Sequence, residues 1–310
     1  MKQIRILFLG GGKRVSLCQR FEVAARYLGL DLKIYAYELN LDQPISKHSE
    51  VIVGKSWTDL GVLEDIRNHV VEKKIDLLVS CVDPATLIHA ELSNELDAAS
   101  LSSSKSVTEL CLSKISFQKF CIENNLRVIP EAKSLEYPAF AKLDHGSASI
   151  GTKYLGNRHD LETLQSGKSY VIQKYILGTE FTVDAYVAKT GLVCGISPRI
   201  RIATSGGEST VTETKIDIEI VEFTRDVIRK LELIGPLTIQ FIREESTGIL
   251  YLMEVNPRFA GGVIASIEAG FDFPRMMLEE IVGKEPLTLE FGKRLIMKRY
   301  FMEAFYAINN

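Results

Sequence analysis

The sequence lacks the residue patterns typical of secreted, zinc-binding or nucleic-acid-binding proteins. Its five cysteines, at positions 18, 81, 111, 121 and 194, are odd in number and form no Cys-x-x-Cys pair or zinc-like Cys/His spacing. This favours buried free thiols in a reducing cytoplasm. Lysine and arginine total 37 against 40 acidic residues and are scattered, so we expect no nucleic-acid partner.

Long apolar runs are also missing. The opening run in MKQIRILFLGGG is too short for a signal peptide, and no later stretch approaches the length of a membrane span. We therefore expect a cytoplasmic protein with no membrane partner. A chain of 310 residues is long enough to bury a sizeable core and to form two or three domains.

The first hundred residues alternate between strand and helix patterns. This alternation predicts a parallel sheet with helical crossovers. We interpret residues 1–105 as a Rossmann-like domain that ends at the polar segment 101–105. The predicted elements are strands at Ile4–Leu9, Asp31–Tyr37 and Asp76–Cys81 and helices at Val15–Leu28 and Asp59–Glu72.

Residues 106–310 change character and predict an α+β region. A helix is expected from about Val107 to Asn124, and the chain becomes mostly β beyond Pro130. We expect a small lid over about 130–176 and a larger platform over about 177–310. The predicted strands are 138–143, 170–176, 180–188, 192–200, 237–243 and 248–255, and the later helices are 160–165, 218–233 and 262–269.

Two glycine-containing segments invite a nucleotide-binding interpretation. In LGGGKRVS the dinucleotide-binding fingerprint would require Gly or Ala at position 15, which is Val15. A nicotinamide-dependent oxidoreductase is therefore only a distant alternative, in which Glu38 would be the acid that binds the ribose. In YPAFAKLDHGSASIGTK, residues 137–153, a strand ending at Lys142 leads into a Gly/Ser loop. Backbone amides and a lysine there suit a phosphate, although a mobile surface hairpin is the other interpretation.

The segment GILYLMEVNPRFAGG, residues 248–262, places polar residues at the end of an apolar strand. Strict alternation would put Leu250, Leu252, Glu254 and Asn256 on one face. A three-residue loop at 246–248 would pair position 245 with 249 and Gln240 with Glu254. The three polar side chains would then offer oxygens to a hard cation such as Mg2+, unless neighbouring groups satisfy a merely structural strand end.

These segments together resemble the ATP-grasp superfamily. The resemblance rests on Lys142 with its loop, on VIQKYILGTEFTVD at 171–184, and on Gln240 followed by MEVNPR at 253–258. The nearest likeness is to short stand-alone proteins similar to the carbamoyl-phosphate synthase large subunit, and GGGKRVSL resembles their preceding Rossmann-like domain. The resemblance covers nearly the whole chain. It implies a Rossmann-like N-terminal domain followed by an ATP-grasp fold with a small lid and a larger antiparallel platform.

The resemblance also implies roles for individual residues. Two departures are Gln240 and Gln173, since many members carry a carboxylate at the first position and some carry an acid at the second. The implied roles are Lys114 and Lys142 for the nucleotide phosphates; Gly146, Ser147, Ser149 and Gly151 in a flap over the β- and γ-phosphates; Gln173, Lys174, Tyr175 and Ile176 as an adenine hinge acting largely through backbone groups; Glu180 for the ribose; Gln240, Glu254 and Asn256 for two Mg2+ ions, with Mn2+ as an alternative; and Arg258 for the transferred phosphoryl group.

The segment ISPRIRIATSGGES, residues 196–209, is the candidate acceptor side. Arg199 and Arg201 are two apart on a predicted strand, so both guanidinium groups would point one way and suit a carboxylate, or else lie on a solvated edge strand. The Gly-rich turn ending at Glu208 is expected to close over a substrate.

Other polar residues have simpler interpretations. We expect Asp83 to form a turn, His145 to be a bystander near the phosphate loop, and Lys298 with Arg299 to lie on a basic helix face.

The sequence thus predicts a ligase that uses ATP and Mg2+ to activate a carboxylate substrate as an acyl phosphate for attack by an amine. The open alternatives are a bicarbonate-activating, carbamoyl-phosphate-type subunit and a non-catalytic ATP-binding protein. A complete synthase with two ATP sites is excluded because the chain carries one set of motifs. The expected partners are small molecules, and a homodimer is the default oligomeric state.

Overall fold

A four-stranded parallel sheet forms the N-terminal part of the chain in this computed structural model, which describes residues 2–93, 95, 101–133, 136–146 and 151–306. Its strand order is β3-β2-β1-β4, and every neighbouring pair is parallel. Sequence periodicity correctly predicts α1 at Val15–Leu28 but misses β3 and α3. The elements are β1 Gln3–Leu9, α1 Val15–Leu28, β2 Asp31–Glu38, the 3-10 turn η1 Pro44–Lys47, β3 Glu50–Val53, α2 Val62–Glu72, β4 Leu77–Ser80 and α3 Asp83–Leu92.

Both faces of this sheet are buried, as a parallel sheet requires. Helices α2 and α3 pack on one face, around Leu7, Tyr37 and Ile66. The other face packs on α1 together with α9 (Phe273–Ile281), from the far end of the chain. The N-terminal sheet is therefore fixed against the C-terminal half of the chain by a shared apolar core.

Two short helices, α4 (Lys105–Leu112) and α5 (Lys114–Glu123), replace the single helix expected from Val107 to Asn124. That prediction is wrong because Ser113 is extended, with φ −95° and ψ 110°, and its hydroxyl accepts a hydrogen bond from the backbone N–H of Ser116. Serine side chains compete with helical hydrogen bonds in this way and favour N-cap positions. The break makes Lys114 the first residue of α5.

A small antiparallel sheet follows, in the order β6-β5-β7. Its apolar core consists of Ala139, Ala141 and Leu155 with a few partly buried neighbours. Helix α6 begins two residues earlier than predicted because Asn157 and Asp160 form a capping box at its start. The elements are β5 Ala139–Leu143, β6 Thr152–Leu155, α6 Arg158–Glu162 and β7 Tyr170–Lys174.

The largest sheet has six antiparallel strands in the order β12-β11-β8-β9-β10-β13. Val183, Ile239 and Phe241 pack with α7 in one apolar cluster. The next residues along these strands, such as Thr182, Thr238 and Gln240, line a cavity on the opposite face. The elements are β8 Gly178–Val187, β9 Val193–Ser205, β10 Glu208–Thr214, α7 Ile218–Leu231, β11 Gly235–Glu244, β12 Leu250–Asn256, α8 Val263–Glu268, α9 Phe273–Ile281 and β13 Ile296–Lys298.

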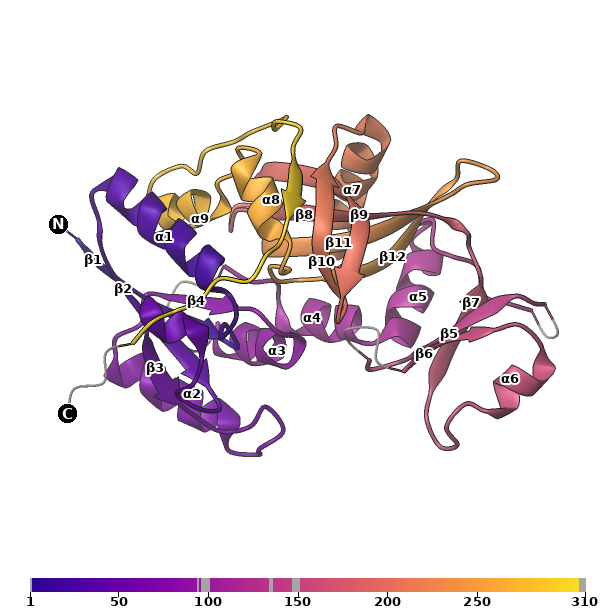
Figure 1. The fold of residues 1–310 in the computed structure, drawn as a ribbon, viewed down its shortest axis with the longest axis horizontal. Coiled ribbons are helices and arrows are strands. Elements are labelled where there is room, and N and C mark those ends of the chain that lie inside the picture. The colour runs from indigo at the N-terminus through magenta and orange to yellow at the C-terminus, as the bar shows by residue number, and fades with distance from the viewer. Residues whose placement is uncertain (1, 94, 96–100, 134–135, 147–150, 307–310) are drawn as a thin grey trace.

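The C-terminal segment also differs from expectation. Lys298 belongs to strand β13, which pairs with β10, and Arg299 donates its backbone N–H to Thr210, so neither lies on a basic helix face. Beyond β13 the chain returns to the N-terminal sheet, where the hydroxyl groups of Tyr306 and Ser46 lie 2.9 Å apart. Figure 1 shows this yellow segment crossing towards the indigo strands.

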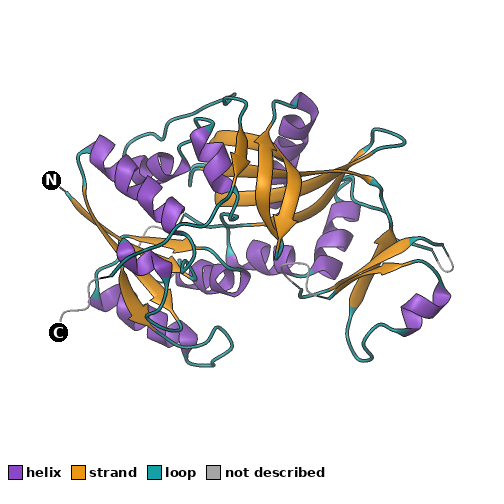
Figure 2. Cartoon of the chain, viewed as in Figure 1, coloured by secondary structure: helices purple, strands orange, loops and turns teal. Residues whose placement is uncertain are grey.

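The arrangement of the three sheets determines the position of the cavity. The N-terminal and small sheets lie at opposite ends of the molecule with the large sheet between them, and α4 and α5 lie beneath it in the view of Figure 1; Figure 2 shows the same layers by secondary structure. The predicted fold class, a Rossmann-like parallel sheet followed by an antiparallel platform with a smaller sheet, is confirmed. The domain limits stay a prediction. No helix within the described ranges is long and apolar enough to cross a membrane.

Candidate functional site

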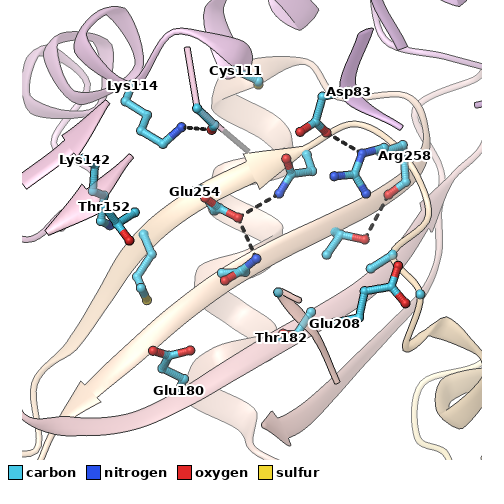
Figure 3. A pocket seen from close by; sticks show the side chains of 18 of the residues that line it. Asp83, Cys111, Lys114, Lys142, Thr152, Glu180, Thr182, Glu208, Glu254 and Arg258 are labelled. Carbon is cyan, nitrogen blue, oxygen red and sulfur yellow. Dashed lines mark hydrogen bonds and ion pairs between the residues drawn. The ribbon is translucent and has the colours of Figure 1, made fainter. Parts of the chain in front are cut away.

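One cavity of about 460 Å³ runs along the large sheet and is also lined by residues from the N-terminal part and from the small sheet. Many of the candidate residues from separate parts of the sequence line it, and Figure 3 labels Lys114, Lys142, Glu180, Glu254 and Arg258 among its lining residues. Those brought together at its wall are Lys114, Lys142, Gly146, Gln173, Glu180, Arg199, Arg201, Gln240, Glu254, Asn256 and Arg258.

The predicted pairing of Gln240 with Glu254 is confirmed, but the hairpin reaches it by an unexpected route. The loop is one residue longer than predicted: the backbone N–H of Glu244 donates to the carbonyl of Ile249 at 2.9 Å, which leaves 245–248 in the turn. Nearer the site, Phe241 pairs with Leu252 and Gln240 with Glu254, so Met253 is an extra residue in β12. This β-bulge offsets the longer loop.

The bulge also corrects the predicted face of the strand. Leu250, Leu252 and Val255 belong to the apolar cluster beneath the sheet, whereas Glu254 and Asn256 line the cavity on the other face. The expectation that Leu250 and Leu252 share a face with Glu254 is therefore wrong, because the extra residue reverses the alternation. The carboxylate is not buried among leucines.

Gln240 and Asn256 converge on the Glu254 carboxylate. The Gln240 side-chain amide donates to Oε1 of Glu254 at 2.6 Å, and the Asn256 amide donates to the same oxygen at 3.1 Å. The orientation of the Gln240 amide is fixed, because its Oε1 accepts a hydrogen bond from Nη1 of Arg201 at 3.1 Å, whereas the opposite orientation of the Asn256 amide would turn its carbonyl oxygen towards the carboxylate. The three residues thus offer one carboxylate and two amide oxygens, a donor set that suits Mg2+ shared with phosphate groups.

Two lysines approach this cluster from across the cavity. Lys142, on β5, is partly buried, and its burial lowers the pKa of its ammonium group; the charges of Glu254 and Glu180 oppose that shift and Lys114 reinforces it. Lys114 donates to the backbone carbonyl of Gly146, which holds the start of the predicted phosphate loop against α5. Two cations facing one carboxylate cluster form a site for a polyanion.

The rest of the predicted phosphate loop is described in part. Ser147 and Ser149 lie outside the described residues. Gly151 has φ +74°, and a Cβ there would lie 2.9 Å from the Cβ of Leu143, so this glycine shapes the β5–β6 hairpin without lining the cavity. His145 is exposed and lies 3.3 Å from Asp144.

Gln173 lies buried at the end of the cavity bounded by the small sheet. Its amide donates to Oε1 of Gln118 at 2.8 Å, while its own Oε1 is buried and accepts no hydrogen bond from the described residues. A buried acceptor without a donor is unfavourable and fits a ligand that supplies an N–H. Lys174 instead pairs with Glu136 at 2.7 Å. The lining residues in the described ranges do not include the side chains of Lys174, Tyr175 and Ile176.

Arg199 and Arg201 both reach the cavity wall, as their spacing predicts, but each is already engaged by the protein. Arg199 is 1% exposed; it binds Asp184 at 2.8 Å through Nε and donates to Ser209 at 3.1 Å. Arg201 donates to Glu180 at 3.0 Å and to Gln240 at 3.1 Å. Both guanidinium groups are therefore held by hydrogen bonds within the cavity wall. The spacing of the two arginines in the sequence did not predict these hydrogen bonds.

Arg258 is held by a residue that the sequence interpretation treated as a turn-former. Its Nε donates to Oδ1 of Asp83 at 2.5 Å, and Nη1 donates to the carbonyl of Phe259 at 3.2 Å. Asp83 begins α3, directly after β4, and lines the cavity. Ligands of parallel sheets bind at this carboxyl edge, so the position after β4 was the available signal.

Arg14 is a second residue that sequence reasoning missed. It precedes α1, at the same edge of the N-terminal sheet, and its Nη2 lies 2.6 Å from Glu208. Glu208 also binds Arg299 at 2.7 Å. Although burial alone would raise the pKa of Glu208, hydrogen bonds and charge from Arg14 and Arg299 lower it to about 2. The turn that precedes Glu208 is thus fixed across the cavity, and its closing over a substrate stays a prediction.

Comparisons with known proteins find similar sequences for part of the chain. A family model described as "ATP-grasp in the biosynthetic pathway with Ter operon" matches residues 166–298. The carbamoyl phosphate synthase large chain of Caldanaerobacter subterraneus subsp. tengcongensis is 34% identical over 129 residues, and that of Clostridium beijerinckii is 30% identical over 148. These matches cover 38% and 42% of this chain but only 12% and 13% of the relatives' length.

Solved structures match over most of the chain. N5-carboxyaminoimidazole synthetase from Staphylococcus aureus, complexed with ADP, superposes with a TM-score of 0.76 and 18% identity, covering 96% of this chain and 82% of that one. The biotin carboxylase complex with β,γ-ATP from Campylobacter jejuni gives a TM-score of 0.73 at 16% identity, covering 90% and 71%. At such identities the likeness establishes the fold.

Residues 166–298 therefore match an ATP-grasp family, as the motifs predicted, and most of the chain shares its fold with the solved structures above. In sequence, the chain is similar to one part of the carbamoyl phosphate synthase large chain.

Proposed function

We propose that the protein is a Mg2+-dependent ligase that uses ATP to phosphorylate a carboxylate substrate and joins the resulting acyl phosphate to an amine, releasing ADP and phosphate. The observation that supports this most directly is the cluster of Gln240, Glu254 and Asn256 facing Lys142 and Lys114 across one cavity. Phosphoryl transfer requires mainly positioning and neutralisation of charge, and these groups supply both.

Each part of the cavity has a place in this scheme. Gln173, with its unfilled buried acceptor, suits the adenine end. Lys114, Lys142 and the backbone of Gly146 hold the phosphates. Glu254, Gln240 and Asn256 would hold two Mg2+ ions, which when bound would neutralise charge on the oxygens of the transferred group. Arg258, oriented by Asp83, would stabilise the transferred phosphoryl group.

The acyl phosphate is then attacked by the amine. The protein needs no covalent nucleophile for this step, because the phosphate is itself a good leaving group. Arg199 and Arg201, fixed by Asp184 and Glu180, shape the wall beside the carboxylate substrate. We retain both as residues whose loss would impair substrate positioning.

A second candidate function is activation of bicarbonate. The sequence relatives are carbamoyl phosphate synthase large chains. One matched structure, the Hydrogenobacter thermophilus 2-oxoglutarate carboxylase biotin carboxylase domain dimer, was solved with MgADP and bicarbonate; its TM-score is 0.74 at 16% identity, covering 94% of this chain and 73% of that one. In this variant of the scheme bicarbonate replaces the organic carboxylate.

The test is a nucleotide-release assay with the purified full chain, ATP and Mg2+. Carboxylates and amines are supplied singly and in pairs, with a separate bicarbonate arm, and ADP, AMP and phosphate are quantified. Release of ADP and phosphate that requires a carboxylate–amine pair is expected. Release that requires bicarbonate alone would favour the second candidate. AMP formation, or tight ATP binding without turnover in any arm, would contradict both.

A further inference from the structure

The end of the cavity bounded by the N-terminal sheet carries positive charge that the proposed reaction leaves unused. We propose that Arg14 binds a second anionic group of the acceptor substrate, a carboxylate or a phosphate, in addition to the carboxylate that is activated. This inference rests on the proposed ligase function and narrows its substrate class. It would exclude bicarbonate and simple monocarboxylates as the natural acceptor.

The first support is the number of hydrogen bonds that each arginine of the cavity already makes. Arg199 donates to Asp184 through Nε and Nη2 and to Ser209 through Nη1, so all three of its nitrogens are engaged. Arg201 donates to Glu180, Gln240 and the carbonyl of Gly207. Neither residue has the two adjacent open nitrogens that bidentate binding of a substrate anion needs.

Arg14 differs in this respect. Its side chain is 15% exposed and lines the cavity, and its Nη2 lies 2.6 Å from Oε1 of Glu208. Within the described ranges, Nε and Nη1 have no protein partner. A largely buried guanidinium with unfilled donors loses hydration that only a ligand or water can replace. Glu208, held in turn by Arg299, fixes the direction in which these nitrogens point.

Small residues beside Arg14 let its ion pair with Glu208 lie close to the backbone at the cavity wall. A Cβ at Gly261 would lie 2.6 Å from Nη1 of Arg14 and 2.5 Å from Oε2 of Glu208, so a side chain there would displace the ion pair. Gly261 and its neighbours Ala260 and Gly262 line the cavity and carry little or no side chain. The small residues after Arg258 thus leave the Arg14 guanidinium accessible.

Arg258 points to the same end of the cavity. Cys81, at the end of β4, is buried, and this burial raises the pKa of its thiol to about 11, while the nearby charges of Arg14 and Arg258 both act to lower it. Both guanidinium groups are therefore close to the same cavity-lining residue. An acceptor that extends from the oxygen cluster past Arg258 would place a second anion at Arg14.

The experiment measures binding without turnover. The full chain is saturated with Mg2+ and a non-hydrolysable ATP analogue, so that the phosphate subsites are filled. Calorimetry then measures the affinity for glutarate and succinate, which carry two carboxylates, for phosphoglycolate, which carries a carboxylate and a phosphate, and for acetate as the monoanion. The first three should bind more tightly than acetate, and the order among them distinguishes a second carboxylate from a phosphate.

Three variants make the result specific. Arg14→Gln should weaken binding of the preferred dianion at least about tenfold, as expected for lost hydrogen bonds to a charged group, and should leave acetate unchanged. Arg14→Lys should restore part of the affinity. Arg20→Gln is the matched control, because Arg20 lies on α1, which Arg14 precedes, and also pairs with the C-terminal half of the chain, through Glu268, but does not line the cavity. It should behave as the wild type.

The outcomes separate this inference from the function on which it rests. Unchanged dianion affinity in Arg14→Gln, or failure of every dianion to bind to a protein that binds the Mg2+–nucleotide complex, would overturn the role of Arg14 alone. Failure of the wild type to bind the nucleotide would instead refute the proposed function. Nucleotide affinity measured in each variant shows that its site is folded.

Discussion

Asp83 and Arg258 lie 175 positions apart in the chain, yet Oδ1 of Asp83 accepts a hydrogen bond from Nε of Arg258 at 2.5 Å. Both side chains are 16% exposed. Asp83 begins α3 beside the parallel sheet, and Arg258 follows the last strand of the hairpin that carries Glu254. Through this contact, the N-terminal part of the fold orients the Arg258 guanidinium in the cavity.

We predict that Asp83→Asn impairs catalysis more than it impairs nucleotide binding. Asparagine keeps the shape and one acceptor oxygen but loses the charge, so the Arg258 guanidinium should be less firmly oriented. The kcat for ADP release should fall by about tenfold to a hundredfold, the range typical of a misplaced catalytic group, while the KM for ATP stays within about twofold.

The control for this variant is Glu91→Gln. Glu91 is in the same helix, and its ion pair with Lys105, 3.2 Å long, is outside the cavity. It should leave both kinetic parameters unchanged. Equal losses in the two variants would mean that Asp83 only stabilises α3.

Glu254→Gln should abolish the Mg2+ dependence of ATP binding. The change removes the one carboxylate of the oxygen cluster while leaving hydrogen-bonding partners for Gln240 and Asn256. Turnover should fall by at least about a hundredfold, on the scale of altered metal sites, with the thermal midpoint nearly unchanged. The check is ATP affinity with and without Mg2+; a variant that unfolds would instead show that Glu254 is needed for structure.

The alkaline limit of activity should reflect Lys142. An ordinary lysine has a pKa of about 10.4. Burial lowers the pKa of the Lys142 ammonium group, so its charged form is lost at a lower pH than in an ordinary lysine. Activity should therefore fall as pH rises through that lowered pKa. Because bound phosphates favour the charged form, the limb of kcat should lie at higher pH than that of kcat/KM. Lys142→Arg should remove the limb; an unchanged profile would assign it elsewhere.

Glu38 should make folding stability depend on pH. Its burial raises the pKa of the carboxyl group to about 7, although hydrogen bonds from the backbone of Gly12 and Gly11 act to lower it. Between the ordinary value of 4.5 and about 7, the folded protein holds a proton that the unfolded chain releases. The contribution to stability is therefore complete below pH 4.5 and is lost as pH rises through about 7.

Urea unfolding at pH 5 and pH 8 measures this effect. Glu38→Gln should make the unfolding midpoint less dependent on pH than in the wild type, because the isosteric amide cannot titrate. Glu245→Gln, at an exposed carboxylate in the β11–β12 turn, should keep the wild-type dependence. A wild-type dependence in Glu38→Gln would show that other groups control it.

Much of the fold was predictable because local patterns determine it. Alternating apolar runs specify the N-terminal strands, and the periodicity of 15–28 specifies α1. A turn ending at position 248 was also anticipated, and Gly248 there has φ 72°, a value that favours glycine. The Gln240–Glu254 pair was reached because an incorrect loop length and an unrecognised bulge offset each other.

The remaining features depend on contacts between distant parts of the chain. No periodic pattern records that Arg14 meets Glu208 or that Arg258 meets Asp83, because an ion pair between distant segments leaves no spacing in the sequence. The position of Arg14 and Asp83 after β1 and β4 was the one usable signal. Likewise, the short strand β13 forms only because β10 offers it an edge.

The bulge at Met253 has a consequence for how this hairpin tolerates changes in length. Residues 245–248 form an exposed turn, so natural insertions or deletions there should be accepted, as in most surface loops. Losing Met253 alone would give β12 a regular alternation in which Glu254 directly follows Leu252, so Glu254 would still face the cavity and Val255 the apolar cluster. Length variants of this hairpin should therefore be tolerated in the turn and at Met253, whereas deletion of Val255 would turn Asn256 towards the apolar cluster and disrupt the cavity.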